Sequence, residues 1–271
     1  KLDRFHLKLL RKAVLENNRI EELCDGRFSP VRYKYLSTFF TQNFEKDMLE
    51  NINTFCAKLY EKCLCLAPIY NMFGEIKEYH DLLVQDDDRC HFCGNTSLVT
   101  KYESVRNAFD HYLAKQTYPF VSVNFKNLVP VCNACNSLYK KSKDILLQGE
   151  KRVKAFYPYT NQSYSIQVTI KFKKGRVYTK DLKPSDFDLE CTCVGYQEQV
   201  DTWMRIYSIE KQYKAKCCSP AYKAYLTCIY DDVKNKNMSI DDSLRHYENN
   251  IDYDMNFLKV AFFKAALATI K

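Results

Sequence analysis

The chain has 271 residues, of which 46% are hydrophobic and 14% aromatic, a composition that predicts a folded globular protein and excludes a disordered one. Its 41 Lys and Arg residues outnumber 33 Asp and Glu residues, and the formal charge of +8 favours a polyanionic partner. The 13 cysteines are too scattered for a secreted disulfide framework in a chain of this size. We therefore expect a reducing, cytoplasmic environment.

No apolar run in the sequence is long enough to cross a bilayer. The most apolar stretch, residues 260–270, is interrupted by Lys264 and is shorter than the roughly 20 residues that a spanning helix needs. Leu9 and Leu10 stand among basic residues, and no cleavable signal pattern follows them. We expect a soluble protein with no membrane partner.

Residues 1–85 are expected to form an N-terminal helical region. Apolar residues recur there at the spacing of one helix face. They are Phe5, Leu9, Leu10 and Val14 in a first stretch, and Phe55, Leu59, Cys63 and Leu66 in a second. Ser29 and Pro30 separate the two stretches, and an acidic turn at residues 86–88 ends the region.

Residues 151–271 are expected to form a β-hairpin followed by a C-terminal helical region. The first strand of the hairpin is indicated by alternating apolar residues. These are Tyr164, Ile166, Val168, Ile170 and Phe172. A turn at residues 173–175 would lead into a second strand around Val177.

Helical spacing returns beyond Pro184 and continues to the end of the chain. The residues that carry it are Val200, Trp203, Ile206, Tyr207, Tyr213, Leu226 and Ile229, followed by the stretch 257–270. Aromatic residues at this spacing favour packing in a core over stacking on nucleic-acid bases.

Residues 86–150 form the most distinctive part of the sequence, because two CxxC pairs stand in it. The pairs are Cys90 with Cys93 and Cys132 with Cys135. Four thiolates at this spacing are typical of a closed, tetrahedral zinc site, which folds a module and does no chemistry itself. A zinc ribbon would separate its pairs by about 15 to 20 residues. Here the gap is longer, so further structure must be built inside it.

The stretch FDHYLAKQTYPFVSVNFKNLVPVCNACNSLYKKSK, which fills that gap and continues past it, resembles the His-Asn-His (HNH) endonuclease family. The family pattern is DH, a proline-containing turn, NL, and a CxxC that leads into a helix. The resemblance implies a mostly α fold with a small α+β core. It would contain a central ββα-metal finger with structural zinc, a β-hairpin and flanking helices. One strand would end at Asp110 and His111, a second would cover residues 127–131, and the helix would begin near Asn133.

The resemblance also implies a role for each matching residue. His111 corresponds to the general base, and Asn127 to the residue that holds the loop and the base in place. Asp110 and Asn136 correspond to the ligands of a catalytic metal ion. Ala114 departs from the family pattern, which often has proline there, and Asn136 stands where many members have histidine.

An oxygen-donor site of this kind favours Mg²⁺ or Mn²⁺ over zinc, because hard divalent cations prefer oxygen ligands and stabilise the charge of a phosphodiester transition state. A neutral imidazole can take the proton of the attacking water. The sequence therefore predicts a metal-dependent endonuclease with His111 as its base.

The expected substrate is nucleic acid, DNA rather than RNA, and Lys140, Lys141 and Lys143 are candidate phosphate contacts. The flanking helices are similar to those of HNH nuclease subunits that accompany an ATPase in bacterial antiphage systems such as Septu and retrons. That likeness implies an ATPase partner that gates the nuclease. Two alternatives remain: a zinc-folded nucleic-acid-binding or adaptor protein with a vestigial site, and a homing or restriction enzyme. The second would need a base-reading element, and the sequence has no recognisable one.

Overall fold

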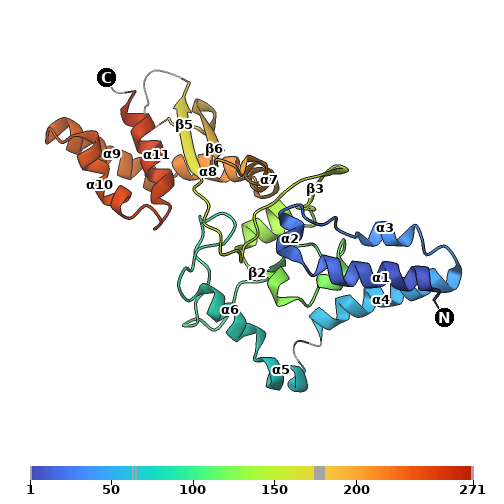
Figure 1. The fold of residues 1–271 in the computed structure, drawn as a ribbon. Coiled ribbons are helices and arrows are strands. Elements are labelled where there is room, and N and C mark those ends of the chain that lie inside the picture. The colour runs from blue at the N-terminus through green and yellow to red at the C-terminus, as the bar shows by residue number, and fades with distance from the viewer. Residues whose placement is uncertain (1, 63, 65, 174–180, 270–271) are drawn as a thin grey trace. The chain divides into compact units, whose positions relative to one another are not determined.

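The chain is mostly helical, as predicted, with a few small antiparallel sheets, and helices make up 52% of the residues that the structure describes (Figure 1). The computed structural model describes residues 2–269 apart from 63, 65 and 174–180. Within those limits, no helix combines the length and apolar character needed to span a membrane.

Two compact units make up the chain. The first consists of residues 1–92 and 96–163, and the second of residues 164–271 together with 93–95. Each unit is described below by itself.

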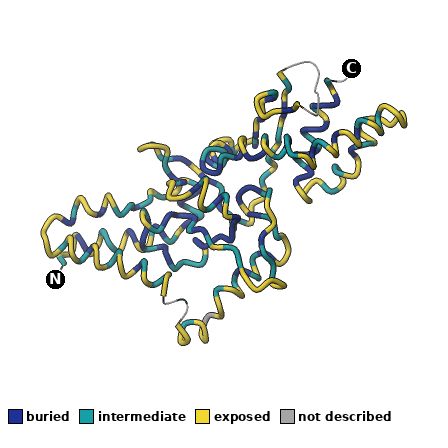
Figure 2. The backbone as a smooth tube through the Cα atoms, turned by 180° about the vertical axis from the view of Figure 1, so that it is seen from behind, coloured by how far each residue is buried: buried dark blue, intermediate teal, exposed yellow. Residues whose placement is uncertain are grey.

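Helices at the beginning of the first unit supply most of its secondary structure. They are α1 (Arg4–Asn17), α2 (Ile20–Cys24), α3 (Tyr33–Ser37), α4 (Asn43–Glu61), α5 (Ala67–Phe73) and α6 (Ile76–Val84). The predicted helical region is therefore confirmed, with the break at Ser29 and Pro30 between α2 and α3. Figure 2 shows buried and exposed stretches alternating along these helices.

The buried face of α1 differs from the predicted one. Phe5 and Val14 are exposed, whereas His6, Ala13 and Asn17 are buried. The polar residues can be buried because both find partners. The His6 ring lies 3.0 Å from the carbonyl oxygen of Phe39, and the Asn17 amide bonds both backbone groups of Val31 at 2.8 and 2.9 Å. Hydrogen bonding thus sets the inward face of this helix as much as hydrophobicity does.

An apolar cluster joins α1, α3 and α4, and α1 and α4 lie side by side (Figure 1). Its buried members are Ala13, Val31, Leu36, Phe40 and Leu49. Phe120, from the middle of the chain, packs against the same cluster. The helical region and the central module therefore share one core.

The central module begins with two short antiparallel strands, β1 (Phe109–His111) and β2 (Leu128–Pro130). Asp110 pairs with Val129 and His111 with Leu128. A π-helix, η4 (Ala134–Lys140), follows β2. The two predicted strands and the following helix are confirmed, although the helix is wound more loosely than expected.

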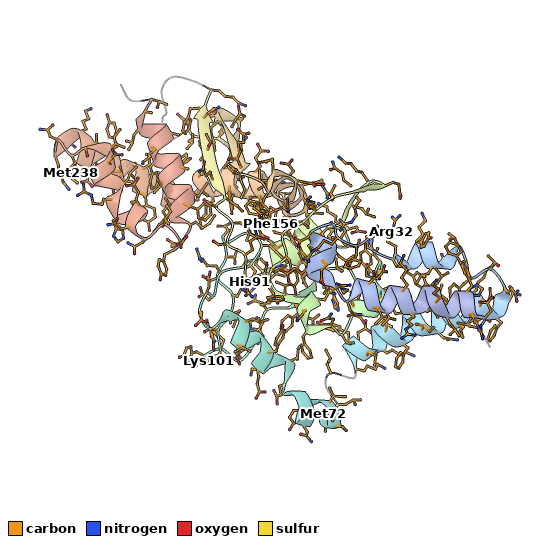
Figure 3. All side chains as sticks on the ribbon, viewed as in Figure 1. Arg32, Met72, His91, Lys101, Phe156 and Met238 are labelled. Carbon is orange, nitrogen blue, oxygen red and sulfur yellow. The ribbon has the colours of Figure 1, made fainter. Side chains whose placement is uncertain are left out.

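Short elements complete the first unit. They are η2 (Pro119–Val121) and η3 (Phe125–Asn127) between β1 and β2, and the paired strands β3 (Leu147–Gln148) and β4 (Lys151–Arg152). Tyrosine hydroxyls fasten the segment after β4 to the strands. Tyr159 donates to the carbonyl of Leu128, and Tyr112 to that of Phe156, which Figure 3 labels.

The second unit is built on a pair of antiparallel strands, β5 (Gln167–Phe172) and β6 (Phe187–Thr192). The sequence predicted the first strand but placed its partner around Val177, which lies outside the described residues. β6 stands where helical spacing was expected to have returned. Its own alternation is clear, because Phe187, Leu189 and Cys191 are buried and the residues between them are exposed.

Helices pack around these strands. They are α7 (Gln197–Tyr207), α8 (Ile209–Cys217), α9 (Pro220–Asn235), α10 (Ile240–Asn249) and α11 (Asn256–Leu267). Phe262 of α11 contacts the rings of Phe172 and Phe187 in the strands. Tyr207 and Tyr213 are buried, as predicted for aromatic residues that pack in a core, and Trp203 is half-buried against the ring of Tyr213.

Candidate functional site

Two CxxC pairs that are far apart in the sequence lie together in the structure. Their sulfur atoms are all within 4.8 Å of one another, and all four residues are buried. This cysteine cluster consists of Cys90, Cys93, Cys132 and Cys135. Tetrahedral zinc with Zn–S bonds of about 2.3 Å would hold sulfur atoms roughly 3.8 Å apart. The cluster could therefore hold a structural metal ion, as the sequence predicted.

Backbone amides point at the sulfur atoms of the cysteine cluster. The N–H of Asn95 donates to Sγ of Cys93, and that of Cys132 to Sγ of Cys90, each at 3.4 Å. The N–H of Cys135 donates to Sγ of Cys132 at 3.5 Å. Hydrogen bonds to a charged acceptor are stronger than those to a neutral one, so these amides favour thiolates, the form that binds metal.

No second metal cluster accompanies the first in the part of the chain that the structure describes. The cysteine cluster is the one group there of three or more His, Cys, Asp or Glu side chains close enough to share an ion. Cys191 and Cys193, a further closely spaced pair of cysteines, are both buried and do not belong to such a group. They serve as small core residues.

His111, at the end of β1, has a fixed orientation. Its Nε2 lies 3.0 Å from the backbone carbonyl oxygen of Ser122. Because a carbonyl can only accept, Nε2 carries the hydrogen, and Nδ1 of the neutral ring holds the free electron pair. Burial lowers the pKa of His111 to about 4, with smaller contributions from Lys115 and Lys140 in the same direction. The imidazole is therefore neutral at pH 7 with a free electron pair on Nδ1, and its low pKa makes it a weaker base than an ordinary histidine.

Helix α4 supplies the surroundings of His111. The ring of Tyr60 meets the imidazole edge to face, with 4.2 Å between the ring centroids. The hydroxyl of Ser122 donates to the carbonyl of Cys56 at 2.7 Å, which fixes the residue whose own carbonyl holds His111. Lys115 lies over the Tyr60 ring and forms an ion pair with Glu61 at 2.9 Å.

Asn127 is fully buried and joins both ends of the loop between the strands. Its Oδ1 accepts from the N–H of Leu113 at 2.7 Å. Its Nδ2 donates to the carbonyls of Leu113 and Val121 at 3.1 and 3.2 Å. Val121 directly precedes Ser122, so Asn127 fixes the segment that orients His111. Contacts of this kind are expected of a residue that holds the loop and the base in place, the role that the resemblance implies for Asn127.

Replacing Asn127 by Asp is expected to destabilise the chain by at least about 3 kcal/mol. The change is nearly isosteric, but it places a carboxylate oxygen against two carbonyl oxygens in a buried position. Chemical denaturation of the two proteins measures the difference. The matched control is Asn161→Asp at an exposed position, expected to change stability by less than about 0.5 kcal/mol. Equal stability of both variants would contradict the assignment.

Asp110 forms a buried ion pair with Lys140. Nζ of Lys140 donates to Oδ1 at 2.9 Å and to the backbone carbonyl of His111 at 2.7 Å. Oδ2 of Asp110 lies 2.8 Å from the same nitrogen, but not in hydrogen-bond geometry. Burial raises the pKa of Asp110, and the neighbouring ammonium opposes that shift. We refer to these residues as the Asp110–Lys140 pair.

The residues of this site do not fit the Mg²⁺ or Mn²⁺ ion that the resemblance implies. Both carboxylate oxygens of Asp110 already face an ammonium group, and the side chain is 4% exposed. Asn136, the other expected ligand, lies half-buried on η4, and no hydrogen bond joins it to Asp110. A hard divalent cation needs several free oxygen donors, and the ion pair with Lys140 leaves neither oxygen of Asp110 free.

The prediction that Lys140 contacts phosphate is also wrong. Its side chain is fully buried, because the ion pair and the His111 carbonyl hold the ammonium inside the module. Lys141 and Lys143 are exposed, and contact with phosphate by these two remains a prediction.

The low pKa of His111 predicts a loss of stability in acid. The folded-state pKa of His111 is about 4, below the value of about 6.5 in an unfolded chain. As the pH falls below 6.5, the unfolded chain binds a proton more readily than the folded chain, so acid favours unfolding. Between pH 7 and pH 5 this group should cost about 2 kcal/mol. Replacing His111 by Gln should remove that part of the acid sensitivity. Unfolding by denaturant at both pH values, with zinc present throughout, measures it. Parallel losses in the two proteins would show that His111 has an ordinary pKa.

Comparison of the chain with protein-family models, with curated proteins and with solved structures gave no match in any of the three.

Proposed function

We propose that the chain is an endonuclease of the HNH type, which hydrolyses phosphodiester bonds with His111 as general base. In this proposal β1, β2 and η4 form a ββα-metal finger, and zinc in the cysteine cluster folds it. The observation that carries the proposal is the orientation of His111. A neutral imidazole is held by the Ser122 carbonyl through Nε2, which leaves Nδ1 as the proton acceptor.

The residues of the site support the following chemistry. Nδ1 of His111 takes a proton from water, and the water oxygen forms a bond to phosphorus. The bond from phosphorus to the 3′ oxygen breaks in line, and that oxygen takes a proton from solvent water, which leaves a 5′-phosphate and a 3′-hydroxyl. The imidazolium of His111 then returns its proton to the hydroxide formed in solvent. Asn127, through the loop that carries Ser122, keeps the imidazole in place during the reaction.

A nucleic-acid substrate, with DNA favoured over RNA, agrees with the charge of +8. We further propose that an ATPase subunit gates the nuclease in antiphage defence, since an ungated nuclease would damage its own cell. Purification from the native host tests this point. An ATPase that copurifies is expected, and a chain that purifies alone and cleaves freely would contradict the gating.

The function is tested by incubating the purified chain with plasmid DNA and with total RNA, in the presence of Mg²⁺, of Mn²⁺ and of a chelator. The His111→Ala variant is treated in parallel. Cleavage by the wild-type chain and none by the variant is the expected result. Equal cleavage by both proteins would remove His111 from its proposed role.

One observation favours a second function, a nucleic-acid-binding or adaptor protein with a vestigial site. The Asp110–Lys140 pair fills the place that the resemblance gives to a catalytic metal ion. An adaptor would bind nucleic acid or a partner equally well with His111 or Ala at position 111, and neither protein would cleave. The assay above therefore separates the two functions.

A further inference from the structure

Lys140 is an unusual lysine because its whole side chain, including the ammonium group, is buried. Lysine is almost never fully buried unless its charge is paired. Here the charge is paired with one carboxylate, that of Asp110, at 2.8 Å between Nζ and Oδ2.

The oxygen atoms around this ammonium are those that a metal ion would use. They are the two carboxylate oxygens of Asp110 and the backbone carbonyl of His111. Carboxylate and carbonyl oxygens are the usual ligands of hard divalent cations. The lysine nitrogen therefore sits where a cation would bind, and it is held there by η4, of which Lys140 is the last residue.

We propose that the ammonium group of Lys140 occupies the cation position of this site and excludes divalent metal ions from Asp110. A divalent ion on Asp110 would lie within a few ångströms of the ammonium in a buried place, where repulsion between like charges is strong. Binding would therefore require Lys140 to leave, and its charge would lose both partners. The inference concerns the same residues as the proposed nuclease site, but it does not rest on cleavage.

Manganese binding tests the proposal directly. The zinc-loaded full chain is titrated with Mn²⁺, and the loss of the free-ion signal is followed by electron paramagnetic resonance. The wild-type chain is expected to show no tight site. Lys140→Met should gain one site that binds Mn²⁺ at least ten times more tightly, and the double variant Lys140→Met, Asp110→Asn should lose it again.

The matched control is Lys141→Met, which removes the same charge from the exposed neighbouring residue. It should not create the site. A wild-type chain that binds Mn²⁺ as tightly as Lys140→Met would overturn the proposal, as would a folded Lys140→Met variant without any gain.

A measurement on the wild-type chain covers the case in which Lys140→Met does not fold. Nitrogen-15 NMR detects a buried, hydrogen-bonded ammonium group because its protons exchange slowly. The Lys140 signal is expected to stay unchanged when millimolar Mg²⁺ is added, and its loss or shift at that concentration would overturn the proposal. Neither measurement involves cleavage. A chain that cleaves no nucleic acid but keeps its Lys140 signal therefore refutes the nuclease and leaves this inference standing.

Discussion

Replacing Cys132 by Ser is expected to release the metal ion from the cysteine cluster and to unfold the module around β1, β2 and η4. A structural zinc ion contributes apparent binding free energies on the order of 10 kcal/mol to the domains that it folds. That is comparable to the whole free energy of unfolding of a typical domain, about 5 to 15 kcal/mol. Serine offers a poor ligand in place of a thiolate, and the three remaining sulfur atoms leave one coordination position open. Metal content by mass spectrometry and thermal unfolding by circular dichroism measure the two effects.

The control for this experiment is Cys24→Ser. Cys24 is as buried as Cys132 and lies in the same unit, but it does not belong to the cysteine cluster. Its substitution should cost some stability and leave the metal content at one ion per chain. A Cys132→Ser protein that keeps its metal and its melting temperature would show that the cluster is a group of buried thiols.

Replacing His111 by Ala is expected to lower the cleavage rate by a factor on the order of 10² to 10⁴, the usual contribution of a general base. Affinity for nucleic acid should be nearly unchanged, because the imidazole acts on water and not on the bound strand. Single-turnover cleavage measures the rate, and fluorescence anisotropy with a labelled duplex measures the affinity. The loss should therefore appear in the rate alone.

His246→Ala provides the comparison, since His246 is an exposed histidine on α10. Its rate should equal that of the wild-type chain. A loss of binding in His111→Ala equal to its loss of rate would indicate a structural histidine, because Tyr60 and the Ser122 carbonyl would then have lost their packing partner.

The elements that the sequence predicted well are those whose signals are local. The strands around His111 and Leu128 and the helix that follows were implied by the resemblance of a short, continuous stretch of sequence to a family pattern. β6 differs from the prediction although Phe187, Leu189 and Cys191 alternate, because the strand is short and is followed closely by residues at helical spacing. The inward face of α1 was wrong because buried polar residues there are satisfied by a distant segment.

In the candidate site, too, local features could be predicted and long-range contacts could not. The four cysteines could be predicted because CxxC spacing is itself a geometric constraint. Tyr60 could not, since it reaches His111 from α4, and the hydrogen bond that ties this helix to the loop joins Ser122 and Cys56, 66 residues apart in sequence. The contact of the Ser122 carbonyl with His111 could not either, because it is a backbone group that no residue pattern marks. The sequence does not predict the Asp110–Lys140 pair, because a lysine at the end of a helix is normally solvated and nothing in the residue order shows that this one turns inward.

The π-helical winding of η4 gives the site a tolerance for a change in chain length. A π turn holds about one residue more than an α turn, so the loss of one residue between Cys135 and Lys140 would be taken up if the helix tightened to α winding. The cysteine and the lysine would then keep nearly the same directions relative to each other. A single codon deletion within η4 is therefore expected to leave Lys140 facing Asp110.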